Sequence, residues 1–424
     1  MKEEVELTPQ LEAVVTAEVC AGSTLKIVAA AGSGKSTALR LYAERRSLRR
    51  TLYLTFTKAE AAAKDADYKS RGLHHVTVST LHVCAFSATH DLHSGDVADE
   101  LQLDAALLAR LTSSSSVDWP AARRDAVRRT IECFLASDAL EQGAHHVEAV
   151  GVDRGGLLVA AGAVWHAILD SVDGIRLSHD AYLKLCQVLP GRCAAAFGDA
   201  DLVLLDEGHD CTEAQIALAA APARAWGLVI VYDFNQRIYG WRWAATEAYM
   251  AALPAVAVCK LSRSWRFGPA LSLLASQLLS GHREQVSIQG NLARNTAVYE
   301  VAALPFLRVC GVGSQLAVVA RTRRSLFNTA IAGIISNSVE RITLSGGVNA
   351  YSMFGTQDYL LDTYALYAGR ARHDMLLPTE GAARFAKYGF ARFREAARVG
   401  GWSHAIEACA VLYKTPSVVP ASFR

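Results

Sequence analysis

The sequence lacks a long apolar run, a paired cysteine motif and a strong charge of either sign. Its longest apolar stretch, Leu157–Leu169, contains a glycine and a histidine and is too short to span a bilayer. The nine cysteines form no CxxC pair, which argues for reduced thiols and against a disulfide framework. No apolar segment follows the charged N-terminus, so no signal peptide is predicted. These absences predict a soluble, intracellular chain without a membrane partner, nuclear in a eukaryote and cytoplasmic in a bacterium.

The charge balance neither predicts nor excludes a nucleic-acid partner. The chain carries 43 Lys and Arg against 41 Asp and Glu, a formal net charge of +2. Any nucleic-acid surface must therefore come from local arrangement. A length of 424 residues predicts two or three domains with a large core.

Short apolar runs alternate with helix-compatible stretches, which predicts an α/β fold with a parallel sheet covered on both faces. We expect strands at Leu25–Ala30, Thr51–Phe56, Val76–Ser79, Asp201–Asp206, Gly227–Asp233 and Ala255–Leu261. Between about Ala85 and Ala200 helical periodicity replaces the strand pattern, which predicts an inserted helical subdomain. A second α/β region begins near Pro269, with its clearest strand at Leu316–Ala320 and a helix from Ser325.

The inserted helical stretch contains a group of arginines at spacings that gather them on one helix face. They are Arg123, Arg124, Arg128 and Arg129. Two interpretations stay open: the face contacts a phosphate backbone, or it is an ordinary solvated helix surface.

A glycine-rich loop follows the first expected strand. Residues 29–37 read Ala-Ala-Ala-Gly-Ser-Gly-Lys-Ser-Thr and lead into a helix-compatible stretch, the order of a phosphate-binding loop. Because Gly32 and Gly34 carry no Cβ, the backbone amides can close on a phosphate. Lys35 would reach the β- and γ-phosphates, and the Ser36 hydroxyl would ligate Mg²⁺.

The loop departs from the GxxxxGK[ST] pattern at one position, where Ala29 replaces a glycine. The alternative interpretation is a glycine-rich turn before an ordinary helix. If the loop binds a nucleotide, the expected contacts are Ala31, Gly32, Ser33, Gly34, Lys35, Ser36 and Thr37.

Two acidic residues end the fourth expected strand. Asp206 is placed to hold Mg²⁺, directly or through water, and Glu207 to orient and deprotonate an attacking water. The sequence between Lys35 and Asp206 is longer than a bare P-loop domain needs, which agrees with an inserted subdomain. The alternative is that both acids merely begin a loop after a buried strand.

A polar amide and a row of aromatic side chains follow the fifth expected strand. Gln236 comes just after the strand, and Tyr239, Trp241 and Trp243 follow together with two arginines. Aromatic rings beside arginines form a stacking platform for unpaired bases. The next segment, Leu261–Gly268, is rich in cations and lies near a predicted domain junction.

In this order the segments resemble the motifs of superfamily 1 helicases of the UvrD/Rep type, and among them those of the F-box DNA helicase branch. Residues 31–37, 55–63 and 78–82 resemble motifs I, Ia and Ib, respectively. Residues 206–210 resemble the DEAQD motif, residues 233–244 the GDPNQRIYGFRGA motif, and residues 261–268 motif IV. Residues 320–322 resemble the start of the second motor domain. The resemblance covers roughly residues 5–370.

The resemblance implies a RecA-like P-loop NTPase sheet with an inserted helical subdomain and a partial second RecA-like domain. The implied domains are 1A at residues 1–85 and 195–265, 1B at 86–194, and 2A at 266–424. The implied function is an ATP-dependent DNA helicase or translocase, in a setting such as DNA repair. It would hydrolyse Mg-ATP and bind single-stranded DNA, with a 3′-to-5′ direction implied by family only.

The resemblance also implies roles for single residues. Gln236 would sense the γ-phosphate and couple it to DNA, and Arg266 would contact the γ-phosphate from the second domain. Gln10 would read the adenine, although its spacing is one residue short of the usual Q motif. The residues expected to line the single strand are Phe56, Thr57, His82, Tyr239 and Trp241. His209 replaces a glutamine that is frequent in the family, and we expect it to hydrogen-bond between the ATP and DNA sites.

Two later motifs of the family are not found: a TxHxxKGxE-like segment that grips DNA and a VAxTRA-like segment that supplies an arginine. We therefore expect an incomplete second motor domain, in a truncated product, a degenerate copy, or a split protein whose second chain supplies these motifs. The alternative function is a non-unwinding module that binds ATP and DNA. A small-molecule P-loop kinase would leave the Tyr239–Trp243 platform and Arg266 unexplained.

Overall fold

The computed structural model of the chain describes most of residues 7–280 and little beyond them. The described residues are 7–92, 97–98, 101–113, 119–150, 156–171, 175–221, 225–280, 287–294, 296, 319, 329, 391–392 and 394–395. The chain divides into two units, residues 1–298 and 299–424. Apart from single positions, the strand expected at Leu316–Ala320, the helix expected from Ser325 and most of the predicted domain 2A lie outside the described residues.

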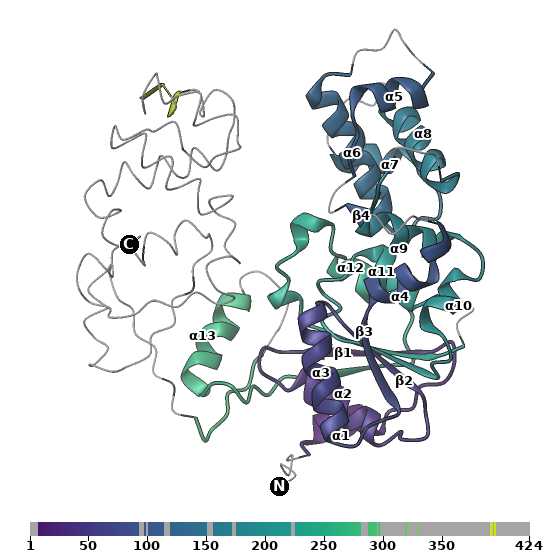
Figure 1. The fold of residues 1–424 in the computed structure, drawn as a ribbon. Helices are drawn as coiled ribbons and strands as arrows, with labels where there is room; N and C mark the ends of the chain where they lie inside the picture. The colour runs from purple at the N-terminus through teal and green to yellow at the C-terminus, as the bar shows by residue number, and fades with distance from the viewer. Residues whose placement is uncertain are drawn as a thin grey trace, which may run out of the picture. The chain divides into compact units, whose positions relative to one another are not determined.

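The first unit is built on a sheet of six parallel strands in the order β3-β2-β6-β7-β1-β8 (Figure 1). The strands are β1 (Thr24–Ala29), β2 (Thr51–Thr55), β3 (Val76–Thr80), β6 (Leu202–Leu205), β7 (Gly227–Tyr232) and β8 (Ala257–Leu261). Each bound lies within two residues of the strand expected from the sequence. The predicted α/β fold with a parallel sheet is confirmed.

Alternate residues of the central strands pack into two cores on opposite faces of the sheet. In β6, Leu202 and Leu204 belong to one core, and Val203 and Leu205 to the other. The first face is covered by α1 (Pro9–Thr16), α2 (Lys35–Glu44) and α3 (Lys58–Ser70). The second is covered by α4 (Leu81–Ala88), α9 (His179–Val188), α10 (Arg192–Phe197), α11 (Glu213–Ala219) and α12 (Glu247–Ala252).

Further helices separate β3 from β6 in the sequence and correspond to the expected insertion. They are α5 (Ala105–Leu111), α6 (Ala121–Ala136), α7 (Ala144–Val150) and α8 (Leu157–Leu169). A short parallel ladder joins β4 (Val97–Ala98) to β5 (Leu177–Ser178), and η1 (His90–Leu92) precedes it. In Figure 1 these helices lie beyond α9, away from the sheet. Among the described residues, no helix is both long and apolar enough to cross a bilayer.

Two of the four arginines of α6 hydrogen-bond to residues close to them in the sequence. Arg128 donates hydrogen bonds to Asp125 at 2.5 Å and to Glu132 at 2.6 Å. Arg124 donates to the carbonyl of Trp119 at 2.8 Å. Of the two interpretations of this face, these contacts favour the solvated helix surface.

All six strands of the large sheet run in the same direction, so their carboxyl ends meet at one edge. This is the edge at which open parallel sheets bind ligands. Strand β7 is followed by the short 3₁₀ helices η2 (Phe234–Gln236) and η3 (Gly240–Arg242). Strand β8 is followed by residues 262–268 and then by α13 (Pro269–Ser280). Because β7 lies between β1 and β6, the residues that follow β7 lie between the glycine-rich loop and the acidic pair.

A buried lysine on β1 anchors α12. Lys26 is 5% exposed, and its Nζ donates to the carbonyls of Met250, Ala251 and Leu253 at 3.0, 3.2 and 2.8 Å. The carbonyls in the last turn of a helix have no donor within the helix, so the lysine satisfies them. Burial lowers the pKa of Lys26, but its three hydrogen bonds favour the charged amine.

We expect Lys26→Met to lower the free energy of unfolding by about 2 kcal/mol, because it removes charged hydrogen bonds and leaves carbonyls unsatisfied. Lys260→Met is the matched control, since Lys260 is exposed on the neighbouring strand β8, and it should change stability by less than about 0.5 kcal/mol. Urea unfolding measures both. Equal stability of the two variants would show that Lys26 does not anchor α12.

Candidate functional site

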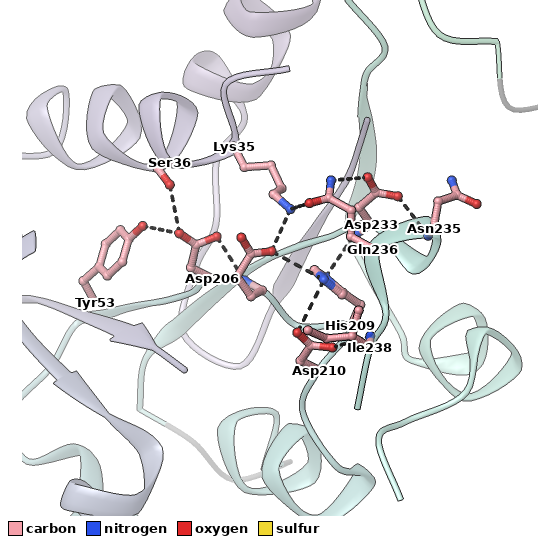
Figure 2. A network of polar contacts seen from close by, with 11 residues as sticks. Lys35, Ser36, Tyr53, Asp206, His209, Asp210, Asp233, Asn235, Gln236 and Ile238 are labelled. Carbon is pink, nitrogen blue, oxygen red and sulfur yellow. Dashed lines mark hydrogen bonds and ion pairs between the residues drawn. The ribbon is translucent and has the colours of Figure 1, made fainter. Parts of the chain in front are cut away.

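Two loops at the carboxyl edge of the sheet bring together four of the predicted site residues (Figure 2). The Nζ of Lys35 lies 2.6 Å from Oε2 of Glu207, and the Oγ of Ser36 donates to Oδ2 of Asp206 at 3.1 Å. Lys35 begins α2, and the two acids directly follow β6. The glycine-rich loop and the acidic pair therefore face each other, as the sequence predicted.

The backbone of the glycine-rich loop uses conformations that favour glycine. Gly32 and Gly34 have φ angles of +72° and +89°, in the left-handed region where a side chain costs about 1–2 kcal/mol. Ser33 between them is buried, and its Oγ has no hydrogen-bond partner among the described residues. A buried hydroxyl without a partner at the start of a helix suits a phosphate oxygen. The other two predicted nucleotide contacts, Ala31 and Thr37, flank the loop and are half-buried.

Ser36 and Asp206 offer one hydroxyl and one carboxylate. In the described part of the chain, no three His, Cys, Asp or Glu side chains converge on a metal site. Mg²⁺ needs fewer protein ligands, because it is usually held by one or two carboxylates together with substrate phosphates. The residues present therefore fit a magnesium ion that binds with a nucleotide, and their assignment as ligands stays a prediction.

Glu207 combines backbone strain with a shifted pKa. Its φ angle is +53°, which is uncommon for a residue other than glycine. Burial raises the pKa of Glu207, the charge of Asp206 raises it further, and Lys35 opposes both. A raised pKa makes the carboxylate a stronger base, and strain with such a shift is typical of catalytic positions.

Gln236 lies beside the lysine, as expected for a residue that follows β7. Its Oε1 is 3.5 Å from the Nζ of Lys35, and its Nε2 donates to Oδ2 of Asp233 at 2.5 Å. Oδ1 of Asp233 accepts the backbone N–H of Asn235 at 3.0 Å, which fixes the carboxylate. The amide is therefore held next to the lysine, and its expected contact with a γ-phosphate stays a prediction.

His209 is a buried imidazole that lies between two acidic side chains. It is 2% exposed, and its Nδ1 accepts the backbone N–H of Asp233 at 3.1 Å, so the ring proton is on Nε2. Nε2 lies 3.6 Å from Oε2 of Glu207 and 3.8 Å from Oδ2 of Asp210. Burial, aided by the charge of Lys35, lowers the pKa of His209 to about 4. The imidazole thus lies close to both carboxylates without a hydrogen bond to either, and its expected role between the ATP and DNA sites stays a prediction.

Two of the aromatic residues expected on the DNA track stack on each other. The ring centres of Phe56 and Tyr239 are 4.9 Å apart with an interplanar angle of 24°, and both residues are half-buried. Oδ1 of Asp210 accepts the backbone N–H of Ile238 at 3.3 Å, which ties the loop of Tyr239 to the acidic segment. The aromatic pair is thus connected to the residues around Glu207.

The other residues expected to line single-stranded DNA do not belong to this aromatic pair. Thr57 is exposed and its hydroxyl caps α3 by accepting the N–H of Glu60 at 3.1 Å. His82 on α4 has its Nε2 3.8 Å from Oδ1 of Asp180 on α9. The side chain of Trp241 lies outside the described part of the structure. Their contacts with a strand stay predictions.

The segment after β8 lies directly on the glycine-rich loop. The N–H of Trp265 donates to the carbonyl of Gly32 at 2.8 Å. A Cβ at Gly32 would come within 2.7 Å of the Cβ of Arg266 and 2.8 Å of the Oγ of Ser264. Arg266 therefore begins beside the loop, with its side chain exposed, and no larger residue fits at position 32.

Gln10 contacts the same segment. Its Nε2 donates to the Oγ of Ser262 at 2.9 Å, and its Oε1 accepts the N–H of Ser262 at 3.0 Å. The amide retains a second N–H for another partner. The adenine contact expected of Gln10 stays a prediction.

Sequence reasoning missed Tyr53. This tyrosine on β2 is fully buried, and its hydroxyl donates to Oδ2 of Asp206 at 2.6 Å. The available signal was a hydroxyl in the middle of a buried strand, because a buried tyrosine usually needs a hydrogen-bond partner.

Comparison with known proteins agrees with this geometry. The chain is 30% identical over 307 residues to F-box DNA helicase protein 1 of Schizosaccharomyces pombe, covering 67% of this chain and 34% of that protein. It is 27% identical over 309 residues to F-box DNA helicase 1 of Gallus gallus, covering 68% and 29%. The chain is a relative of the superfamily 1 helicases. It spans about a third of the length of these two relatives, and no family model matches it.

This relationship confirms the family resemblance seen in the motifs, and the six-stranded parallel sheet is consistent with the RecA-like fold of these helicases. The roles of single residues in this helicase relative remain predictions that the geometry supports.

We expect the neutral state of His209 to make stability depend on pH. Folding lowers its pKa from 6.5 to about 4, so between these values the unfolded chain binds a proton that the folded chain does not. The free energy of unfolding is therefore highest above pH 6.5, where neither state binds this proton. It decreases as the pH falls toward 4. His209→Gln should therefore reduce the slope of unfolding free energy against pH by up to about 1.4 kcal/mol per pH unit.

Urea unfolding between pH 7 and pH 4.5 measures this slope. His146, whose pKa is also lowered to about 4, contributes equally to both proteins and cancels in the difference. The exposed His90→Gln is the matched control and should keep the slope of the unmodified chain. An unaltered slope in His209→Gln would mean that this imidazole is not buried in its neutral form.

Proposed function

We propose that this chain binds Mg-ATP and single-stranded DNA and hydrolyses ATP as the motor of a superfamily 1 DNA helicase or translocase. The observation that carries the proposal is the convergence of Lys35 and Ser36 on Glu207 and Asp206 across the glycine-rich loop. The stacked Phe56 and Tyr239 and the named helicase relatives support DNA as the second ligand and disfavour a small-molecule kinase.

When a nucleotide binds, the amine of Lys35 would exchange the carboxylate of Glu207 for a phosphate. Its amine is paired with Glu207 at 2.6 Å, and a γ-phosphate in the loop would take over this pair and release the carboxylate. Glu207, whose pKa is raised by burial, then accepts a proton from the attacking water. Magnesium held by Ser36 and Asp206 would neutralise charge on the phosphate oxygens. Arg266, which begins beside Gly32, can add a further cation.

A continuous series of contacts joins this exchange to the aromatic pair. His209 lies next to Glu207 and Asp210, and Asp210 holds the backbone of Ile238. The next residue, Tyr239, stacks on Phe56. When Glu207 loses its ion pair with Lys35, the resulting shift would move the loop that carries Tyr239. Nucleotide binding would in this way change the affinity for a base.

ATP turnover tests the catalytic part of the proposal. We expect the rate to rise when single-stranded DNA is added, and Lys35→Ala to abolish both the basal and the stimulated rates, because the phosphates lose their cation. Lys69→Ala, at an exposed ion pair on α3, is the control and should keep both rates. Equal, DNA-independent rates in the unmodified chain and Lys35→Ala would contradict the proposal. Binding of both ligands without turnover would favour the non-unwinding module.

Strand affinity tests the aromatic pair. Tyr239→Ala should weaken binding of single-stranded DNA about 10-fold, because base stacking contributes about 1–3 kcal/mol per base. Tyr239→Phe keeps the ring and should bind like the unmodified chain. Fluorescence anisotropy at one fixed salt concentration measures all three proteins. An undiminished affinity in Tyr239→Ala would remove the aromatic pair from the DNA site.

A further inference from the structure

Asp206 is held by three donors, and one of them comes from inside the sheet. Oδ2 accepts the hydroxyls of Tyr53 at 2.6 Å and Ser36 at 3.1 Å, and Oδ1 accepts the N–H of Glu207 at 3.0 Å. Figure 2 shows Tyr53 and Ser36 reaching the same carboxylate oxygen from different elements. The carboxylate is thus fixed in one orientation before any ligand binds.

The hydroxyls of Ser36 and Tyr53 differ in how easily they can reorient. Ser36 is half-buried at the start of α2 and is the predicted metal ligand, so its hydroxyl can turn toward the metal. Tyr53 is fully buried, and its ring packs on that of Tyr68 with centres 5.3 Å apart. A ring enclosed in a close-packed core keeps its orientation. The tyrosine hydroxyl is therefore the side-chain donor that stays on Asp206 when a nucleotide enters.

We propose that Tyr53 is a positioning residue that holds Asp206 in the orientation that binds magnesium, so that nucleotide affinity depends on Mg²⁺ through this hydroxyl. The inference rests on the proposed function, because it assigns a task within the same site. Groups that hydrogen-bond to metal-binding carboxylates typically change metal affinity 10- to 100-fold when they are removed.

The neighbouring tyrosine provides a matched control. Tyr68 is 1% exposed, touches the ring of Tyr53, and its hydroxyl has no hydrogen-bond partner among the described residues. Tyr68→Phe therefore removes the same atom type from the same core without removing a donor from Asp206.

The experiment measures binding of a fluorescent non-hydrolysable ATP analogue to the full chain, in EDTA and across a Mg²⁺ titration. We expect Tyr53→Phe to raise the Mg²⁺ concentration for half-maximal enhancement of binding about 10- to 100-fold. Its affinity in EDTA should stay within about 2-fold of the unmodified chain, because the loop contacts do not involve the hydroxyl. Tyr68→Phe should match the unmodified chain in both conditions.

The same Mg²⁺ requirement in Tyr53→Phe and in the unmodified chain would overturn this inference and leave the proposed function standing. Absence of analogue binding by the unmodified chain would overturn both, and Lys35→Ala reports on the proposed function separately. Tyr53→Met, which also lacks the donor, is the second variant should the phenylalanine variant fail to fold. A Mg²⁺ requirement like that of the unmodified chain in either folded variant overturns the inference.

Discussion

The buried amine of Lys35 is compensated by an anion, and this ion pair organises the site. Lys35 is only 9% exposed, and an unpaired cation at such a position costs several kcal/mol. Glu207 supplies the anion at 2.6 Å. A phosphate that enters the loop then replaces an existing ion pair and meets a cation and a set of amides that are already oriented. Burial at this position and the charge of Asp206 raise the pKa of Glu207, and the neighbouring Lys35 opposes both effects.

The order of the strands extends this pair into a larger network. Because β7 separates β1 from β6, Gln236 and Asp233 lie between the loop lysine and the acidic segment. His209 is enclosed behind them and contacts both sides. The same edge of the sheet thus carries the residues proposed to bind phosphates and the stacked Phe56 and Tyr239. In the proposed function the nucleotide site and the DNA site would share rigid elements, and the parallel sheet is such an element.

The sequence predicted what depends on local pattern. The strands were predictable because continuous apolar runs can be buried on both faces, and the loop was predictable because two glycines precede Lys35 and Ser36. Contacts between distant segments were not predictable, because they depend on strand order and packing. Tyr53 lies 153 residues from Asp206, and Gln10 lies 252 residues from Ser262. The acidic partners of Arg128 were visible in the sequence, but their pairing depends on side-chain conformation.

A crystal structure of the chain with Mg²⁺ and a non-hydrolysable ATP analogue tests the central claim most directly. The account predicts the triphosphate in the loop of residues 31–37, Lys35 moved from Glu207 to the phosphates, and the metal between Ser36 and Asp206. An intact pair of Lys35 and Glu207, with the nucleotide bound elsewhere, would contradict it.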